Sequence, residues 1–267
     1  MNKEQLTIAK VADKIRKYEK TGEVCASNFL DPSEIVDAQV IARKYLSFFC
    51  GGYLNSERKI LIIGSDNQED AKDFLDLLTI EIKKANKKYL NKELNNKNTK
   101  KGTVETETNV FSHRDILGSI LGLGINRDVI GDILIKGNRA DVFVIKDISK
   151  YIIQNLEKIG REKVEVYKNS FDNLIEIEDV SKEIKTTVAS LRLDAMISAA
   201  TGLSREVSAK MIQNEKVKLN HKIIVNTSKQ LKIGDKISVR GYGRIELIEI
   251  LGETRKDRIR VVLKKNS

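Results

Sequence analysis

Two stretches of the chain carry residue types that could perform catalysis. Ser112, His113 and Asp115 supply the three side chains of a serine hydrolase triad, and Asp194 could act as a nucleophile. Members of a triad meet in space, whereas Ser112, His113 and Asp115 follow one another on one predicted helical turn. Asp194 begins an amphipathic helix beside Arg192, so we expect it to bind a neighbouring basic group. The sequence therefore predicts no enzyme.

Cofactor and metal sites are not predicted either. The glycines within residues 118–124 match neither the dinucleotide-binding loop nor the P-loop, because no strand or lysine stands at the required spacing. His113, His221, Cys25 and Cys50 are too scattered for a zinc site. We expect no cofactor and no metal.

Basic side chains favour phosphate chemistry instead. Ser204 and Arg205 begin a short predicted helix, where free N–H groups and a guanidinium can bind phosphate. In residues 240–244, glycines allow close approach and Tyr242 can stack on a base. The candidate RNA-binding residues are Arg192, Ser204, Arg205, Lys210, Arg240, Gly241, Tyr242, Gly243 and Arg244, together with His113, Arg114 and Arg127.

A structural interpretation of the same residues stays open. The arginines could be solvated, and Tyr242 could belong to the core. Ser112 could merely cap its helix, with Asp115 favouring the positive helix end. The alternating Arg258 and Arg260 on the last predicted strand fit either interpretation equally well.

The surplus of positive charge lies in the last third of the chain. The net charge of the 267 residues is +10. Residues 181–267 hold 19 basic and 9 acidic side chains, whereas residues 1–180 hold 29 of each. A compact segment this basic is typical of a polyanion-binding domain, because phosphates that it neutralises release condensed counterions.

Composition excludes other classes. Hydrophobic residues make up 40% and charged residues 32%, which suits globular domains. No stretch approaches the ~20 apolar residues that span a bilayer, and the polar start lacks a signal-peptide core. Two cysteines form no disulfide framework, so we expect a cytoplasmic protein without a membrane partner.

The N-terminal part predicts an α/β unit. Apolar residues within 8–15 have helical spacing, and Asp31-Pro32-Ser33-Glu34 begins a helix that should run towards Phe48 and stop near Gly51-Gly52. Residues 59–64 read as a buried strand. Ala71, Leu75 and Leu78 then predict an amphipathic helix.

The middle part predicts a small sheet with helices on one face. A lysine- and asparagine-rich stretch around 86–105 resembles a solvated insertion, with a further strand possible at 106–110. A helix from Ser112, strands at 132–135 and 140–145, a helix ended by Gly160 and a strand at 163–167 follow. The order αββαβ is typical of ferredoxin-like and RRM-like folds.

The last part predicts two short helices broken at Gly202, followed by strands and hairpins. The fold class is therefore α+β: an N-terminal α/β unit, a central ferredoxin/RRM-like unit and a C-terminal αL-type RNA-binding domain of two short helices and a small sheet. The expected domains are residues 1–82, 83–180 and 181–267.

The last unit resembles the RNA-binding domain first described in small-subunit ribosomal protein four. The matching residues cover about 55 positions and are Arg192-Leu193-Asp194, Ser204-Arg205, Ala209, Ile212, the segment 217–220, Gly234-Asp235 and the segment 239–243. His221 stands where that pattern usually has glycine, which leaves the turn of the hairpin open.

The rest of the chain resembles YlmH-type bacterial proteins. The residues concerned are those of 112–119, Gly122 to Ile125, Arg127, Ile130 to Ile133, Phe29 to Glu34 and Gly51-Gly52-Tyr53. The stretch 86–105 departs from the family pattern as an insertion. The resemblance implies a cytoplasmic, monomeric protein that binds structured ribosomal RNA or tRNA on the large ribosomal subunit, and acts in rescue or quality control of stalled ribosomes.

Two alternatives stay open. Arg192-Leu193-Asp194 resembles the catalytic stretch of pseudouridine synthases, which would make the chain an RNA-modifying enzyme with an appended binding domain. A looser association of the family with cell division would instead make it an adaptor whose RNA affinity is incidental.

Overall fold

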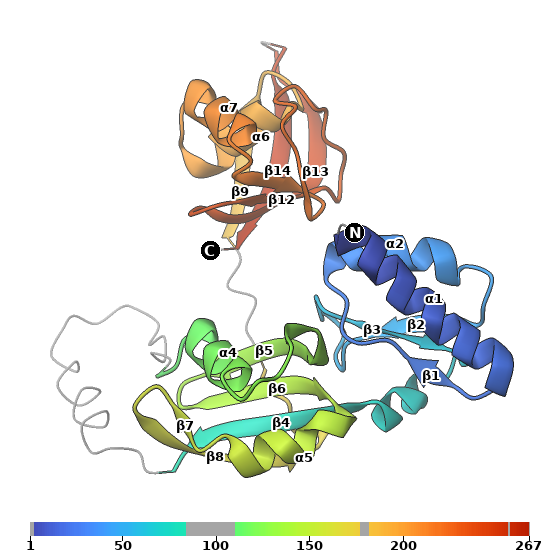
Figure 1. Ribbon diagram of the computed structural model, residues 1–267. Helices are drawn as coiled ribbons and strands as arrows, with labels where there is room; N and C mark the ends of the chain where they lie inside the picture. Colours follow the sequence, from blue (N-terminus) through green and yellow to red (C-terminus); the bar gives the residue numbers. More distant parts are fainter. Residues whose placement is uncertain (1–2, 84–109, 177–181, 256, 267) are drawn as a thin grey trace, which may run out of the picture. The chain divides into compact units, whose positions relative to one another are not determined.

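The computed structural model describes residues 3–83, 110–176, 182–255 and 257–266 and divides the chain into two compact units, residues 1–177 and 178–267 (Figure 1). The helices among the described residues are too short or too polar to cross a membrane. The further division of the first unit into residues 1–82 and 83–180 stays a prediction.

The first unit begins with two helices packed on a small antiparallel sheet. The helices are α1 (Lys3–Thr21) and α2 (Pro32–Ala42), and the sheet has the order β1 (Cys25–Ala26), β3 (Ile60–Ile63) and β2 (Ser47–Cys50). The predicted start of α2 is confirmed, because the Asp31 carboxylate accepts from the Glu34 N–H while Glu34 Oε2 accepts from the Asp31 N–H.

The predicted end of this helix near Phe48 is wrong. The helix ends at Ala42, and Ser47–Cys50 forms an edge strand against β3. Phe48 and Phe49 favour extended backbone, and pairing with the fully buried strand β3 decides their conformation.

The rest of the first unit is a five-stranded antiparallel sheet with α4 and α5 on one face (Figure 1). Its order is β5, β6, β4, β8, β7. The elements are η1 (Gln68–Asp73), β4 (Leu75–Ile82), α4 (His113–Leu121), η3 (Arg127–Val129), β5 (Ile130–Lys136), β6 (Arg139–Ile145), α5 (Lys146–Asn155), β7 (Lys158–Ile159), β8 (Glu162–Asn169) and η4 (Phe171–Asn173). The chain order of β4, α4, β5, β6, α5 and β8 and the strand order confirm the ferredoxin/RRM-like prediction.

The helix predicted through Ala71, Leu75 and Leu78 is wrong, because Leu75–Ile82 forms the central strand β4. Leu78 and Ile80 pack under α4 and α5, whereas Leu75 and Leu77 pack against β3 on the other face. A strand buried on both faces has an apolar run without clear alternation, which helical spacing fits by accident.

One other expectation for the middle part is wrong, and one lies almost wholly outside the described residues. The helix predicted to end at Gly160 ends at Asn155, and Gly160 lies in the turn between β7 and β8. The strand considered at 106–110 lies outside the described residues apart from Val110, which is not in a strand.

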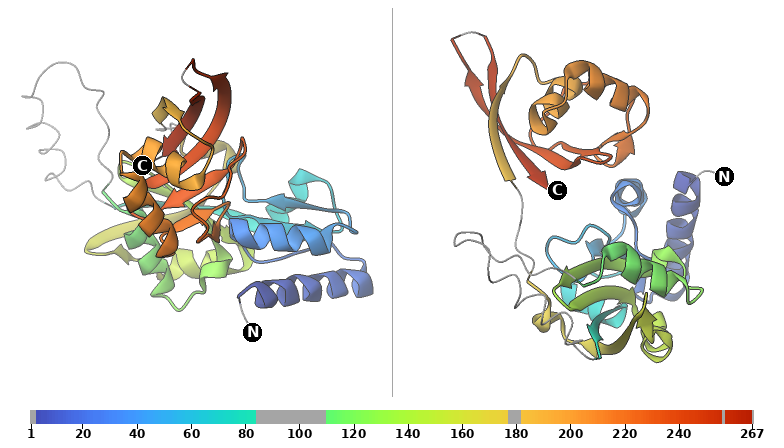
Figure 2. Two further views of the ribbon diagram at one scale, coloured as in Figure 1. Left: turned by 90° about the horizontal axis from the view of Figure 1, so that it is seen from above. Right: turned by 90° about the vertical axis from the view of Figure 1, so that its left-hand side faces the viewer.

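The second unit is a six-stranded antiparallel sheet with two short helices on one face (Figure 2). The strand order is β11, β10, β12, β13, β14, β9. The elements are β9 (Lys182–Val188), α6 (Leu193–Thr201), α7 (Arg205–Gln213), β10 (Val217–Leu219), β11 (Lys222–Ile223), β12 (Lys236–Val239), β13 (Gly243–Glu253) and β14 (Ile259–Asn266). Leu193, Met196 and Ile197 of α6 pack on the sheet with Ile212 of α7. The sequence missed β9, whose mixed polar pattern is that of an edge strand.

The turn at His221 keeps the hairpin geometry without glycine. Asn220 and His221 both have positive φ, 47° and 69°, as in a type I′ turn. The Asn220 side chain donates to Asp235 Oδ1 at 2.8 Å and accepts from the Lys236 N–H at 2.9 Å. These bonds hold the turn in a conformation that histidine alone disfavours.

We predict that Asp141→Ala lowers the free energy of unfolding of the first unit by about 3 kcal/mol. The Asp141 carboxylate is fully buried and accepts from Thr79 Oγ1 at 2.6 Å, from two nitrogens of Arg139 and from the Ile175 N–H at 2.8 Å. Its removal leaves these donors without an acceptor. Urea unfolding measures the change. Asp66→Ala, at an exposed position, should change stability by less than about 0.5 kcal/mol, and equal losses for both variants would contradict the prediction.

Candidate RNA-binding surface

One buried carboxylate joins two of the predicted RNA-binding arginines. Asp194, whose side chain is 7% exposed, accepts from Arg192 Nε at 3.1 Å and from another Arg192 nitrogen at 3.0 Å. Arg205 donates to the same carboxylate at 3.1 Å. The side chains of Arg192 and Arg205 remain 35% and 53% exposed, so both are accessible from solvent. We call Asp194, Arg192 and Arg205 the Asp194 clamp.

The Asp194 clamp is also an electrostatic unit. Burial alone would raise the pKa of Asp194, but the hydrogen bonds from Arg192 and Arg205 outweigh it and hold the pKa below its ordinary value. Two cations share one anion, so the clamp keeps a net positive charge at neutral pH. An aspartate enclosed in this way is poorly placed to act as a nucleophile.

The start of α7 lies beside the clamp. Ser204 caps this helix, because its hydroxyl accepts from the Val207 N–H at 3.2 Å. The backbone N–H groups of Arg205 and Glu206 have no acceptor within the helix and form part of its positive end. Lys210, one turn further, is bonded to Glu206 at 2.7 Å on the exposed side. Lys210 therefore offers a weaker net charge than the clamp arginines.

At the start of α6, backbone carbonyls from a later loop accept the first N–H groups of the helix. Leu193 donates its N–H to the Lys229 carbonyl at 2.9 Å, and Asp194 donates to the Thr227 carbonyl at 3.2 Å. The loop before Leu231 thus fixes Arg192 and the first turn of α6. These hydrogen bonds could not be predicted from the sequence, because they join residues more than 30 positions apart.

The glycine-flanked tyrosine lies in the turn between β12 and β13. Gly241 and Gly243 have φ values of 85° and 87°, which other residues rarely adopt. Tyr242 is 36% exposed, and Arg240 and Arg244 are exposed beside it. The ring is therefore accessible for stacking. The Arg240 N–H bonds the Lys216 carbonyl, so this turn lies beyond the end of α7, whereas the clamp lies at its start.

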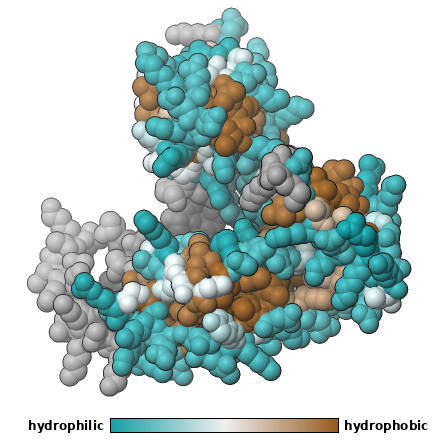
Figure 3. Space-filling view, viewed as in Figure 1, coloured by the Kyte–Doolittle hydropathy of each residue, from teal (hydrophilic) through white to brown (hydrophobic). Residues whose placement is uncertain are grey.

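Arg258 and Arg260 of the second unit both bond other parts of it. Hydrophilic side chains cover much of the face of this unit seen in Figure 3. Arg258 donates to the Thr187 hydroxyl at 3.0 Å and to its carbonyl at 2.7 Å, which favours a structural role. Arg260 donates to the Leu251 carbonyl at 3.4 Å.

The predicted site residues of the first unit divide into exposed and engaged groups. His113 and Arg114 are exposed in the first turn of α4, which Ser112 and Asp115 cap reciprocally. Surrounding protein atoms and the Arg127 charge lower the pKa of His113. His113 is therefore neutral at pH 7 and offers a phosphate a hydrogen bond but no charge.

Arg127 is held inside the unit. Its guanidinium donates to the carbonyls of Ile130 and Gly131, and burial together with the Arg58 charge lowers its pKa to about 10. It stays charged at neutral pH. A phosphate would have to compete with the two carbonyls.

The sheet face of the RRM-like part is not open in the manner of RNA-binding RRM domains, which stack bases on aromatic residues of that face. Phe143 of β6 is fully buried beneath Tyr53 and Phe171, with ring centroids 5.3 and 6.0 Å away. Asn173 accepts from Arg139, so the segment after β8 also covers this face. A base therefore cannot stack on Phe143 at this sheet face in the manner of such RRM domains.

Within the described residues, no group of three or more histidine, cysteine, aspartate or glutamate side chains could hold a metal ion. The fold and the surface together define the class: an α+β protein whose C-terminal unit presents paired arginines and an exposed tyrosine between glycines.

Comparisons with known proteins identify the family. A family model described as "Putative RNA-binding domain in YlmH" matches residues 103–173. The chain is 30% identical to "Ribosome-associated protein quality control protein P2" of Bacillus subtilis (strain 168) over 243 residues, which covers 90% of this chain and 86% of the relative. The chain belongs to the YlmH family, as its residues predicted.

Two solved structures are also similar. "Cell division protein ylmH from Streptococcus pneumoniae" is 19% identical, with a TM-score of 0.46, over 66% of this chain and 96% of that one. Heat Shock Protein 15 of Vibrio cholerae is 26% identical, with a TM-score of 0.21, over 28% of this chain and 82% of that one.

The lowered pKa of Asp194 predicts an acid-sensitive clamp. Since the folded pKa lies below the unfolded value of about 3.9, the stabilisation is complete above that value and is lost as the pH falls through the folded pKa. Urea unfolding from pH 7 to pH 3 should show that Asp194→Asn is less stable than the unaltered protein at pH 7. The difference should shrink at acid pH, and a constant difference would contradict the assignment.

Proposed function

We propose that the chain is a non-catalytic factor that binds structured RNA on the ribosome. The observation that carries this proposal is the Asp194 clamp, which fixes two half-exposed guanidiniums beside the free N–H groups of α7. Guanidiniums so held lose little side-chain entropy when they bind phosphate. The name of the Bacillus subtilis relative supports the ribosome as the partner and quality control as the process.

The mode of binding is shape and backbone recognition. The major groove of A-form RNA is too deep and narrow for side chains, so a protein contacts phosphates, 2′-hydroxyls and unpaired bases. The Asp194 clamp supplies phosphate contacts, and Tyr242 supplies a ring for an unpaired base or a ribose. Structured ribosomal RNA or tRNA of the large subunit is the RNA that we propose, with the protein acting as a monomer during rescue of stalled ribosomes.

The RNA-modifying alternative is less well supported. Pseudouridine synthesis would require Asp194 to attack as a free carboxylate, yet Asp194 accepts three hydrogen bonds from guanidiniums and one from the Ala195 N–H at 2.8 Å. These bonds make the carboxylate a weak nucleophile. We therefore propose that Asp194 positions the two arginines.

We predict that Arg205→Ala and Arg240→Ala weaken co-sedimentation with ribosomes, and that each reduces the slope of log affinity against log salt by roughly one. The reason is that each guanidinium neutralises one phosphate. Arg43→Ala is the matched control, because Arg43 is also an exposed arginine, lies after α2 in the first unit and is not one of the proposed contact residues. Unaltered binding by both variants at physiological salt would reject the site.

A further inference from the structure

The first unit contains a cavity that the proposed RNA-binding surface does not use. Its volume is about 490 Å³, within the range of small-molecule sites. It lies between the loop that follows β2, the short helix η1 and the start of η4. We call it the Gly51 pocket; its lining includes Phe49, Gly51, Tyr53, Ser56, Lys59 and Phe171.

The walls of the Gly51 pocket favour a flat ring. Phe49, Tyr53 and Phe171 are each only partly buried and come from three separate segments of the chain. Tyr53 and Phe171 are held in place by Phe143, on which Tyr53 stacks. Aromatic side chains fixed in this way stack on nucleobases without strong sequence preference.

The charges of the Gly51 pocket favour an anion. Lys59 and Lys72 line it, and no acidic residue does. In the described part of the chain, the Lys59 ammonium has no hydrogen bond or ion pair. Lys72 bonds Glu69, which lies outside the lining. A phosphate group at the pocket would meet the Lys59 ammonium and, more weakly, the Lys72 ammonium that Glu69 partly neutralises, and no acidic residue lines the wall.

A buried hydroxyl at the Gly51 pocket lacks a partner. Ser56 is 7% exposed, and its Oγ has no hydrogen-bond partner among the described residues. A buried polar group without a partner destabilises a fold, and its presence calls for an explanation. The Oγ atom has almost no accessible surface, so a ligand in the pocket does not contact it directly in this structure.

Close contacts around the Gly51-Gly52-Tyr53 motif leave no room for a Cβ atom at either glycine. A Cβ on Gly51 would lie 2.4 Å from Ser56 Oγ and from the Arg58 carbonyl, and a Cβ on Gly52 would lie 2.3 Å from the Phe143 ring. Gly52 also has a φ of 94°. Only glycine lets this loop lie against Ser56 while Tyr53 reaches Phe143.

We propose that the Gly51 pocket binds one unstacked nucleotide, with its base against the aromatic side chains and its phosphate beside Lys59 and Lys72. The nucleotide comes either from a single-stranded RNA segment or from a free mononucleotide. This site is separate from the Asp194 clamp and adds base contacts to a protein whose RRM-like sheet face is covered.

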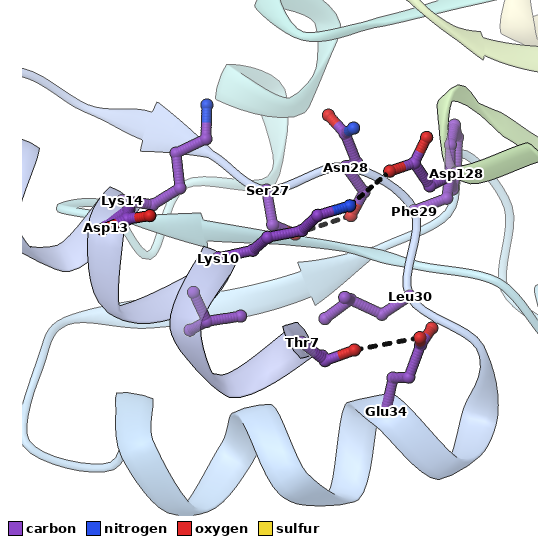
Figure 4. Close-up of a pocket in the computed structure, with 11 residues that line it drawn as sticks. Thr7, Lys10, Asp13, Lys14, Ser27, Asn28, Phe29, Leu30, Glu34 and Asp128 are labelled. Carbon is purple, nitrogen blue, oxygen red and sulfur yellow. Dashed lines mark hydrogen bonds and ion pairs between the residues drawn. The ribbon is translucent and has the colours of Figure 1, made fainter. Parts of the chain in front are cut away.

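Another cavity of the first unit lies between α1 and residues 27–30, and two pairs of its polar side chains bond each other (Figure 4). Lys10 bonds Asp128 at 2.9 Å, and the Thr7 hydroxyl donates to Glu34 at 3.0 Å. Val36 and Val40 of α2 are also exposed, but nothing in the structure shows what would cover them.

A cysteine that lines the Gly51 pocket can report whether a ligand is bound there. Cys50 lines the Gly51 pocket and is partly exposed, whereas the only other cysteine, Cys25, is 3% exposed and has a pKa raised by burial. Iodoacetamide should therefore modify Cys50 far faster than Cys25. A nucleotide in the pocket should slow this modification.

The experiment compares adenosine, AMP, inorganic phosphate and a single-stranded pentanucleotide as protecting agents for Cys50 in the full chain. AMP or the pentanucleotide should protect at concentrations where adenosine and phosphate alone do not. Protection by AMP identifies a free mononucleotide site, and protection by the pentanucleotide alone identifies an RNA segment. Failure of all four to slow the modification would overturn the proposal.

Two variants separate a binding role from a structural one. Lys59→Gln should weaken protection roughly tenfold, whereas Lys44→Gln, at an exposed position outside the pocket, should not. Ser56→Ala should leave protection intact, while the melting temperature stays unchanged or rises because an unpaired buried hydroxyl is removed. Full protection in Lys59→Gln would overturn the proposal. Arg205→Ala should leave protection intact, so failure at one site is distinguishable from failure at the other.

Discussion

The C-terminal unit depends on one buried negative charge. A carboxylate taken out of water is costly unless it is paired, and Asp194 is paired with two guanidiniums that come from the starts of two different helices. The pairing has two consequences. It ties α6 to α7 in one geometry, and it brings Arg192 and Arg205 together although their charges repel each other. The positive surface exists because an anion lies beneath it. In this arrangement the aspartate of the Arg-Leu-Asp stretch, which resembles a catalytic stretch in sequence, is bonded to both arginines.

The first unit also depends on buried residues, but there they cover a sheet face and do not hold arginines together. Its five-stranded sheet has helices on one face, and Phe143 and Leu77 on the other face pack against the small N-terminal sheet. Asp141 then closes the covering segment by accepting the Ile175 N–H. An RRM-like sheet covered on both faces gains core area and loses the open aromatic platform of an RNA-binding RRM. A partner that bound this unit would therefore contact its helix starts and loops and not the sheet face.

Much of this could be predicted from the sequence where local rules decide. The capping box at Asp31, the paired αββα elements and the two C-terminal helices follow from side chains within a few positions of one another. The errors fall where distant pairing decides. Leu75–Ile82 reads as a helix until its place between two buried faces is known, and β2 is extended because β3 lies beside it. The candidate residues were found by type, but sequence could not show that Arg127 is engaged by backbone carbonyls while Arg205 remains half exposed.

The two motifs in which glycines stand beside a tyrosine have different physical reasons, although they look alike in sequence. At Tyr242, flanking glycines give a turn with positive φ that leaves the ring exposed. At Tyr53, preceding glycines are required by contacts of 2.3–2.4 Å that any Cβ would make, and the ring lies against Phe143. Glycine beside an aromatic residue therefore indicates access in one case and close packing in the other. Only the contacts of the missing Cβ separate the two, which is why the second motif carries no functional signal until its cavity and the unpaired Ser56 hydroxyl are seen.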